Sequence, residues 1–267
     1  MTKKEEKRGK LNLFLKNFKG QVTIFIIIAL IIVALAILFY FLLRKPPVGP
    51  VVTENPAVYI ETCMKEKIED TVTNLSLRGG SVIPSNGYYL YQNNTIEYLC
   101  YTNEYYAPCV VQQPMLAQHI QEEILNNIED DVILCFNSMK DNYEKEGYEV
   151  IMKSGNTSVD LLPERIVTTF GYEVTLTKSS TNKYENFQIV IPRDTYRFAS
   201  IASSIIQWET LYGDAEVTTY MNYYHDLKVE KKKQIDETSI YILTNRDTGE
   251  KFQFASRSYA FPPGVIV

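Results

Sequence analysis

One apolar segment constrains this chain more than any other feature. Residues 22–43 carry no charge and consist almost wholly of Ile, Leu, Val, Ala and Phe. As a helix, the segment would be about 33 Å long, which exceeds the roughly 30 Å of a bilayer's hydrocarbon core. A buried helix of a globular protein would show a polar face, and this segment shows none. The sequence therefore predicts a transmembrane helix over residues 22–43.

The charges on either side of this segment predict its orientation. Seven basic residues precede the segment, and Arg44 and Lys45 follow it directly. Because basic residues stay on the cytoplasmic side, we expect residues 1–21 to be a cytoplasmic leader in a single-pass protein of the cell membrane, with the C-terminal part extracytoplasmic. Of the 27 basic and 32 acidic residues, nine and two precede residue 46, so residues 46–267 have a net charge of −12. This acidity argues against nucleic acid as a partner. The predicted span makes the lipid bilayer an expected partner.

A short stretch before the apolar segment has the pattern of a processing site. Residues 19–23 read KGQVT, which resembles the leader junction of archaeal type IV pilin-like proteins. In that family a peptidase cuts between Gly and Gln, and the apolar helix then drives filament assembly. The resemblance implies cleavage between Gly20 and Gln21. The chain departs from the family at Phe25, where pilins usually carry Glu.

A second resemblance extends beyond the apolar segment. Residues 59–63, YIETC, and the pair Gly79-Gly80 are similar to positions in uncharacterised single-span surface proteins of archaea. The resemblance implies a place at the cell surface, and it implies no activity.

The remainder of the chain is expected to be α+β, with antiparallel strands packed against long helices. A Pro-rich spacer over residues 44–56 leads into one domain over residues 57–267, or into two lobes over 57–147 and 148–267. Apolar residues at helical spacing predict helices over residues 57–77 and 114–146, and a third that begins at Asp194 and ends at Gly213. Strand patterns cover residues 88–92, 95–101, 148–153, 158–162, 166–177, 187–191, 227–233, 239–244 and 251–256.

The four cysteines all lie in the part expected outside the membrane, where disulfides persist. Cys100 and Cys109 are near one another across a loop, which makes them natural partners. Cys63 and Cys135 remain, on the apolar faces of the first and second predicted helices. We therefore predict a Cys63–Cys135 and a Cys100–Cys109 disulfide. The chain has no C-x-x-C pair and its two histidines are remote in sequence, so we expect no metal site.

Tyrosines are concentrated in one stretch of the chain. Seven of them lie within residues 88–106, in a predicted hairpin and the loop that follows. Tyrosine offers a large apolar area with a polar tip, which suits contacts with other surface proteins or with glycans. Tyr105 and Tyr106, at the loop tip, are the predicted contact residues. The alternative is that these rings pack the rim of a small sheet. Separately, Asn74, Asn93 and Asn156 begin sequons for N-glycosylation.

Several residue groups have the composition of a catalytic or metal site. His119 with Glu122 and Glu123, and the acidic run at residues 129–131, are expected to be solvated helix faces. The triplet at residues 247–249, Asp-Thr-Gly, is expected to be a hairpin turn, because an aspartic protease needs a second such triplet. No established catalytic motif is present, although a dispersed Ser/His/Asp set stays open.

We therefore expect a membrane-anchored structural or recognition protein of the cell surface, non-catalytic and without a cofactor. One alternative is a pilin-like subunit that is processed before Gln21 and assembles through its apolar helix. Another is an envelope hydrolase of unrecognised type, which would need a concave cluster of titratable side chains.

Overall fold

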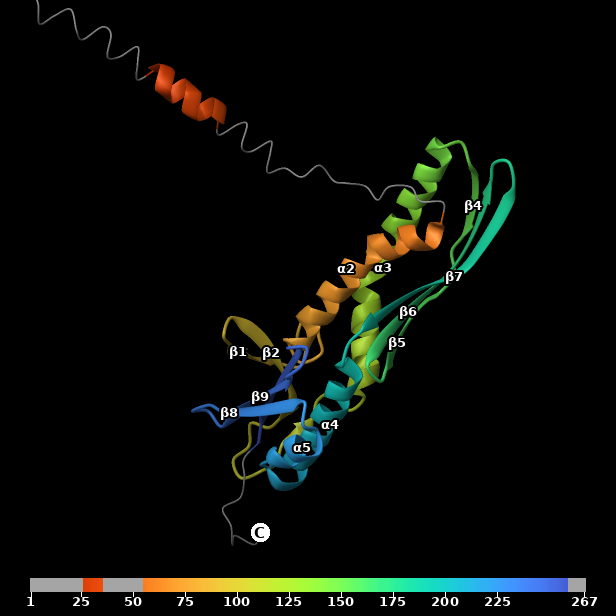
Figure 1. Ribbon diagram of the computed structural model, residues 1–267. Helices are drawn as coiled ribbons and strands as arrows, with labels where there is room; N and C mark the ends of the chain where they lie inside the picture. The colour runs from red at the N-terminus through yellow and green to blue at the C-terminus, as the bar shows by residue number, and fades with distance from the viewer. Residues whose placement is uncertain (1–25, 36–54, 259–267) are drawn as a thin grey trace, which may run out of the picture. The chain divides into compact units, whose positions relative to one another are not determined.

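The computed structural model of the chain describes residues 26–35 and 55–258 (Figure 1). Residues 26–35 form a helix that belongs to one unit of the chain. Residues 55–258 belong to a second compact unit, which is α+β. Both candidate sites discussed below lie in this second unit.

The expected transmembrane helix needs a correction. In the part of the chain that the structure describes, no helix is both long and apolar enough to cross a membrane. The other residues of the predicted span, the leader and the Gly20-Gln21 junction lie outside the described residues.

One part of the second unit pairs two long helices with an antiparallel sheet. Helix α2 covers Pro56–Ser76 and helix α3 covers Leu116–Lys145, both close to their predicted bounds. The sheet contains β4 (Glu149–Lys153), β5 (Thr157–Leu162), β6 (Arg165–Thr177) and β7 (Thr181–Pro192). β7 pairs with β6 along its length, while β5 and β4 pair with the first and second half of β6 on its other edge. Figure 1 shows α2 and α3 beside this sheet.

The apolar stripe of α3 forms the core between this helix and the sheet. Ile120, Ile124 and Ile128 are fully buried along the helix. Phe136 stacks on Tyr172 of β6, with ring centroids 3.7 Å apart. It also meets Phe187 of β7 edge-on at 5.2 Å. The predicted helical periodicity is thus confirmed, and the sheet supplies aromatic rings as the facing surface.

Two glycines explain why β4 and β5 are separate strands. A Cβ atom on Gly155 would lie 1.9 Å from the carbonyl oxygen of Gly171, so only glycine permits this approach of two backbones. The Gly171 N–H donates to the carbonyl of Asn156 at 2.9 Å. The pairing of β6 with β7 is irregular between Phe170 and Glu173, next to the same contact.

The other part of the unit is a mixed sheet with the strand order β1-β2-β10-β9-β8, and β3 pairs with β2. Its strands are β1 (Tyr88–Tyr91), β2 (Asn94–Tyr101), β3 (Val110–Val111), β8 (Leu227–Lys233), β9 (Thr238–Asn245) and β10 (Lys251–Arg257). Strands β2 and β10 are parallel, which corrects the expectation of antiparallel strands throughout. Short turns dictate an antiparallel direction only for consecutive strands, and most of the domain separates β2 from β10.

Helix α4 covers Thr195–Tyr212 and is followed by the short helix α5, Thr218–Tyr223. The predicted stop at Gly213 is confirmed, because this residue adopts a left-handed conformation with φ 70°. Asp194 is at the N-cap position as predicted, but its side chain makes no capping hydrogen bond. Its carboxylate instead accepts hydrogen bonds from Arg197 and Asn245.

Candidate functional site: a tyrosine-lined cavity

Both predicted disulfides are present. Cys63 on α2 is bonded to Cys135 on α3, with Cα atoms 6.2 Å apart. Cys100 on β2 is bonded to Cys109, with Cα atoms 5.4 Å apart. The second bridge closes the loop that carries Tyr105 and Tyr106, directly after the strand that supplies two tyrosines to the cavity described next.

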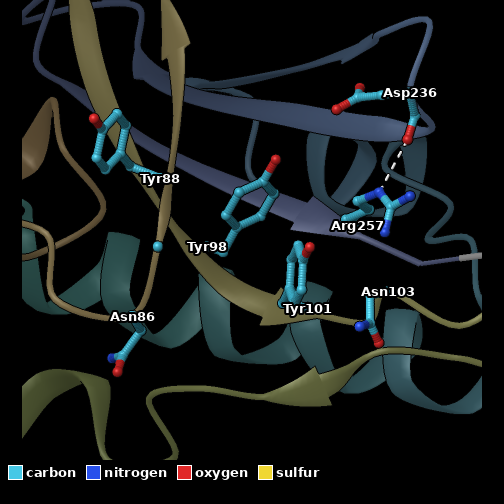
Figure 2. A pocket seen from close by; sticks show the side chains of 8 residues that line it. Asn86, Tyr88, Tyr98, Tyr101, Asn103, Asp236 and Arg257 are labelled. Atoms are coloured by element: carbon cyan, nitrogen blue, oxygen red, sulfur yellow. Dashed lines mark hydrogen bonds between the residues drawn. The ribbon is translucent and has the colours of Figure 1, made fainter.

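A cavity of about 670 Å³ opens beside the end of the β1–β2 hairpin. It is bounded by the loop before β1, by β1 and β2, by the turn between β8 and β9, and by the end of β10. Its lining consists of Asn86, Gly87, Tyr88, Tyr98, Tyr101, Asn103, Asp236 and Arg257. Figure 2 shows Tyr98 and Tyr101 between Tyr88 on one side and Arg257 on the other.

Tyr98 is the fixed element of the cavity wall. Its ring is 7% exposed and packs in a small apolar cluster with Ile96, Ile240 and Ile242. Its hydroxyl is 3.0 Å from Oγ1 of Thr238. Burial raises the pKa of Tyr98 above its ordinary value, and the hydrogen bond with Thr238 opposes this increase. The phenol therefore stays neutral at physiological pH and presents a hydrogen-bonding group in a set position.

Tyr101 and Arg257 form the second part of the wall. The ring of Tyr101 meets that of Tyr98 edge-on, with centroids 4.9 Å apart. The guanidinium of Arg257 lies 5.7 Å from the centroid of Tyr101, within the range of a cation–π contact. Arg257 also donates to the carbonyl oxygens of Thr102 at 2.6 Å and of Asp236 at 3.1 Å. These bonds hold its charge beside the cavity while its side chain stays partly exposed.

Exposed apolar side chains lie close to the cavity residues in the chain. Tyr88 is 56% exposed, and Leu90, two residues further along β1, is 65% exposed. Ile83, in the loop before β1, is 79% exposed, and Ile235 is fully exposed next to Asp236. Large apolar residues that stay in water are a feature of protein-binding surfaces when they surround aromatic and arginine side chains.

The predicted contact residues Tyr105 and Tyr106 are 74% and 64% exposed. They do not line the cavity, and they lie on the loop that the Cys100–Cys109 disulfide closes. Of the seven tyrosines in residues 88–106, those that line the cavity are Tyr88, Tyr98 and Tyr101. The sequence thus predicted the correct tyrosine-rich stretch, but it did not predict which of its tyrosines line the cavity.

The residues that sequence reasoning missed come from the far end of the chain. Asp236 lies in the turn between β8 and β9, and Arg257 ends β10. Neither belongs to a motif, and the parallel pairing of β2 with β10 is what brings Arg257 opposite Tyr101. No signal in the sequence could have placed these residues beside the tyrosines.

A cluster with the residue types of a hydrolase triad lies elsewhere, at the end of α2. Ser81 hydrogen-bonds to the carboxylate of Glu97, and its Oγ atom is 2.7 Å from Nε2 of His119. The serine is thus the middle member, whereas a catalytic triad needs the histidine between serine and carboxylate. Because Ser81 donates to Glu97, it accepts from His119, and the imidazole cannot act as its general base. Ser81 is also only 1% exposed.

This cluster anchors the loop after α2 to α3, and it corrects one expectation. Glu123 accepts a hydrogen bond from the Val82 N–H at 2.8 Å, so His119 and Glu123 hold a loop and are not a solvated face. Gly79 and Gly80 permit this turn with φ values of 91° and 99°. In residues 26–35 and 55–258, no group of three or more His, Cys, Asp and Glu side chains could hold a metal ion.

The three predicted glycosylation sites are all exposed, and the Asp-Thr-Gly triplet lies in a turn as expected. Asn93 is exposed in the β1–β2 turn with φ 71°, and Asn156 is exposed next to the Gly155–Gly171 contact. Asn74 is exposed but lies within α2. The Asp-Thr-Gly triplet is a turn, because the N–H groups of Asp247 and Thr248 donate to Oδ1 of Asn245.

Comparisons of this chain with protein-family models, with curated proteins and with solved structures give no match.

Proposed function

We infer that this protein is an extracytoplasmic, non-catalytic recognition protein that binds a segment of another protein at the tyrosine-lined cavity. The observation that carries this proposal is the cavity wall itself. Tyr98, Tyr101 and Arg257 are held in place by mutual contacts and by hydrogen bonds to Thr238, Thr102 and Asp236. Tyrosine and arginine are enriched among the residues that dominate the binding energy of protein interfaces.

The fixed positions of these side chains support a role in binding. A side chain that is already immobilised loses little conformational entropy when a partner binds, and each flexible side chain would cost about 0.5–1.5 kcal/mol. Tyr98 and Tyr101 are immobilised by their contacts in this way. The Cys100–Cys109 disulfide also restrains the chain around and after them. The exposed apolar residues Ile83, Leu90 and Ile235 supply area for a protein partner rather than for a small polar ligand.

The disulfides support the proposed extracytoplasmic location. Two bridges that include all four cysteines are typical of proteins that fold in oxidising surroundings.

The inverted order of Glu97, Ser81 and His119 argues against the hydrolase alternative at that cluster. The pilin-like alternative depends on residues before position 26 and stays a prediction.

The test is selection of peptides that bind the folded, oxidised protein from a random peptide library. We expect enriched peptides whose affinity falls at least tenfold in Tyr101→Ala, because about 1.4 kcal/mol corresponds to a factor of ten in Kd. Tyr223→Ala is the matched control, since Tyr223 is 77% exposed on α5 and lies outside the cavity. Peptides that bind Tyr101→Ala and the unmodified protein equally well would refute the proposal.

A further inference from the structure

A second cavity, of about 510 Å³, lies where strands β2 and β10 separate. The parallel pairing of these strands begins at Tyr98 and Ala255, and before that point β2 pairs with β1 but not with β10. The end of α2, the beginning of α4 and the turn between β9 and β10 complete the wall. Within the described chain, the first residues of β10 therefore have a ladder partner in β9 but none on the side of β2.

Gln253 of β10 is the residue that points to a ligand. Its side chain is 7% exposed and lines this cavity. Among residues 55–258 no group donates a hydrogen bond to its Oε1 atom. A buried amide carbonyl without a donor is energetically unfavourable, so such an atom calls for a partner that the chain does not provide. A ligand with a hydroxyl or N–H group would provide that partner.

The other lining residues indicate the chemistry of this ligand. Hydroxyl and amide side chains, which both donate and accept, dominate the wall: Thr73, Ser76, Gln92, Asn94, Thr195 and Thr248. Apolar contact comes from Val72, Leu77 and Phe198. The carboxylate of Glu250 is already paired with Arg193 at 3.1 Å, so the wall does not present an uncompensated acid. A ligand that matches this wall has many hydroxyl groups and a less polar face.

We propose that this cavity is a saccharide-binding site, with Gln253 accepting a hydrogen bond from a sugar hydroxyl. The sugar has two conceivable sources with the same chemistry. It is either a free or cell-surface saccharide, or the chain's own glycan on Asn93. The side chain of Asn93 is exposed in the β1–β2 turn, between Gln92 and Asn94, which both line the cavity. The site is distinct from the tyrosine-lined cavity, and no residue belongs to both.

The experiment uses the full-length chain produced in a host without N-glycosylation. Saturation-transfer NMR with glucose, mannose, galactose and N-acetylglucosamine detects binding and ranks these sugars. We expect at least one of them to bind, and Gln253→Met to weaken that binding at least tenfold. The same substitution should raise Tm by about 2–4 °C, because it removes an unpaired buried carbonyl. Gln188→Met is the control, since Gln188 is exposed on β7 and its amide already bonds to Thr169.

The two sources are separated with protein from a glycosylating host. If the glycan on Asn93 occupies the cavity, that protein does not bind free sugar, and Asn93→Gly restores binding. Glycine suits this position because φ is 71°. If the glycosylated protein binds free sugar, the source is a separate saccharide. The proposal is overturned if none of the four sugars binds the unglycosylated chain, or if Gln253→Met leaves binding unchanged or lowers Tm.

Discussion

The two sheets of this protein differ most in what they bury. In the antiparallel sheet of β4 to β7, Thr168 is the one buried polar residue of the strands. The mixed sheet buries six in its strands: Glu97, Thr238, Ser239, Asn245, Gln253 and Ser256. Both cavities considered above open at the mixed sheet, and neither is lined by the strands of the antiparallel one.

This difference indicates which of the two sheets is suited to a binding site. A sheet covered by apolar rings is stabilised by the burial of apolar area, which is a non-directional interaction and cannot orient a ligand. Buried polar groups cost free energy unless they are paired, but paired groups fix positions and directions. The antiparallel sheet with α3 thus serves as the scaffold, and the mixed sheet carries most of the polar groups of the two proposed binding sites.

The largest effect on stability is expected in the scaffold. Phe136→Ala removes a buried ring that stacks on Tyr172 and meets Phe187 edge-on, and leaves a cavity behind. We expect the free energy of unfolding to fall by about 3–5 kcal/mol. Urea denaturation followed by circular dichroism measures this value. A loss below about 1 kcal/mol would show that the antiparallel sheet does not depend on this aromatic contact.

The two disulfides should separate stability from binding. Cys63 and Cys135 are 72 residues apart, so replacing both with Ala should lower the free energy of unfolding by about 4 kcal/mol. Cys100 and Cys109 are 9 residues apart, and their removal should cost about 2–3 kcal/mol. Only the second pair adjoins the tyrosine-lined cavity. Peptide affinity, measured on whichever variants remain folded, should therefore fall for Cys100→Ala/Cys109→Ala and stay unchanged for Cys63→Ala/Cys135→Ala.

A pH dependence should arise from the buried polar groups of the mixed sheet. Burial, and next the adjacent Glu209 carboxylate, raise the pKa of Tyr241 above its ordinary value. The folded protein therefore keeps this phenol neutral where the unfolded chain ionises, near pH 10. Stability is fully present below about pH 10 and falls as pH rises above it, because the unfolded state then binds fewer protons.

The test of this pH dependence is denaturation at several values between pH 8 and 11.5, with Tyr241→Phe as the variant. The variant should lose stability less steeply above pH 10 than the unmodified protein. It should also be less stable at neutral pH by about 1–3 kcal/mol, because Glu209 loses the hydroxyl of Tyr241 as a donor. Equal slopes would mean that other tyrosines, such as Tyr172 in the antiparallel sheet, whose pKa burial also raises, dominate the alkaline loss.

The smallest effect on stability is expected at the loop tip. Tyr105→Ala/Tyr106→Ala changes two exposed side chains, so unfolding should shift by less than about 0.5 kcal/mol. If the partner of the tyrosine-lined cavity extends to this loop, peptide affinity falls while stability stays constant. An unchanged affinity would confine recognition to the cavity and exclude Tyr105 and Tyr106 as contact residues.

The sequence by itself determined the local structure. The apolar stripe of α3, the glycines at positions 79, 80 and 213, and most of the strands were predicted, because side-chain period and glycine geometry act over a few residues. Strand β3 and the first half of β7 were not predicted. The cysteine pairing was also correct, since one pair was close in sequence and the other followed from two helix faces. The predicted transmembrane helix is not confirmed, because no helix among the described residues is both long and apolar enough to cross a membrane.

Only the tertiary structure decided where the candidate sites lie. The parallel contact of β2 with β10 places Arg257 beside Tyr101, and the separation of the same two strands exposes Gln253 to a cavity. This contact joins segments that are about 150 residues apart, with α3, the antiparallel sheet and α4 between them in the chain. Local periodicity carries no information about such a contact, because it depends on the packing of the whole domain.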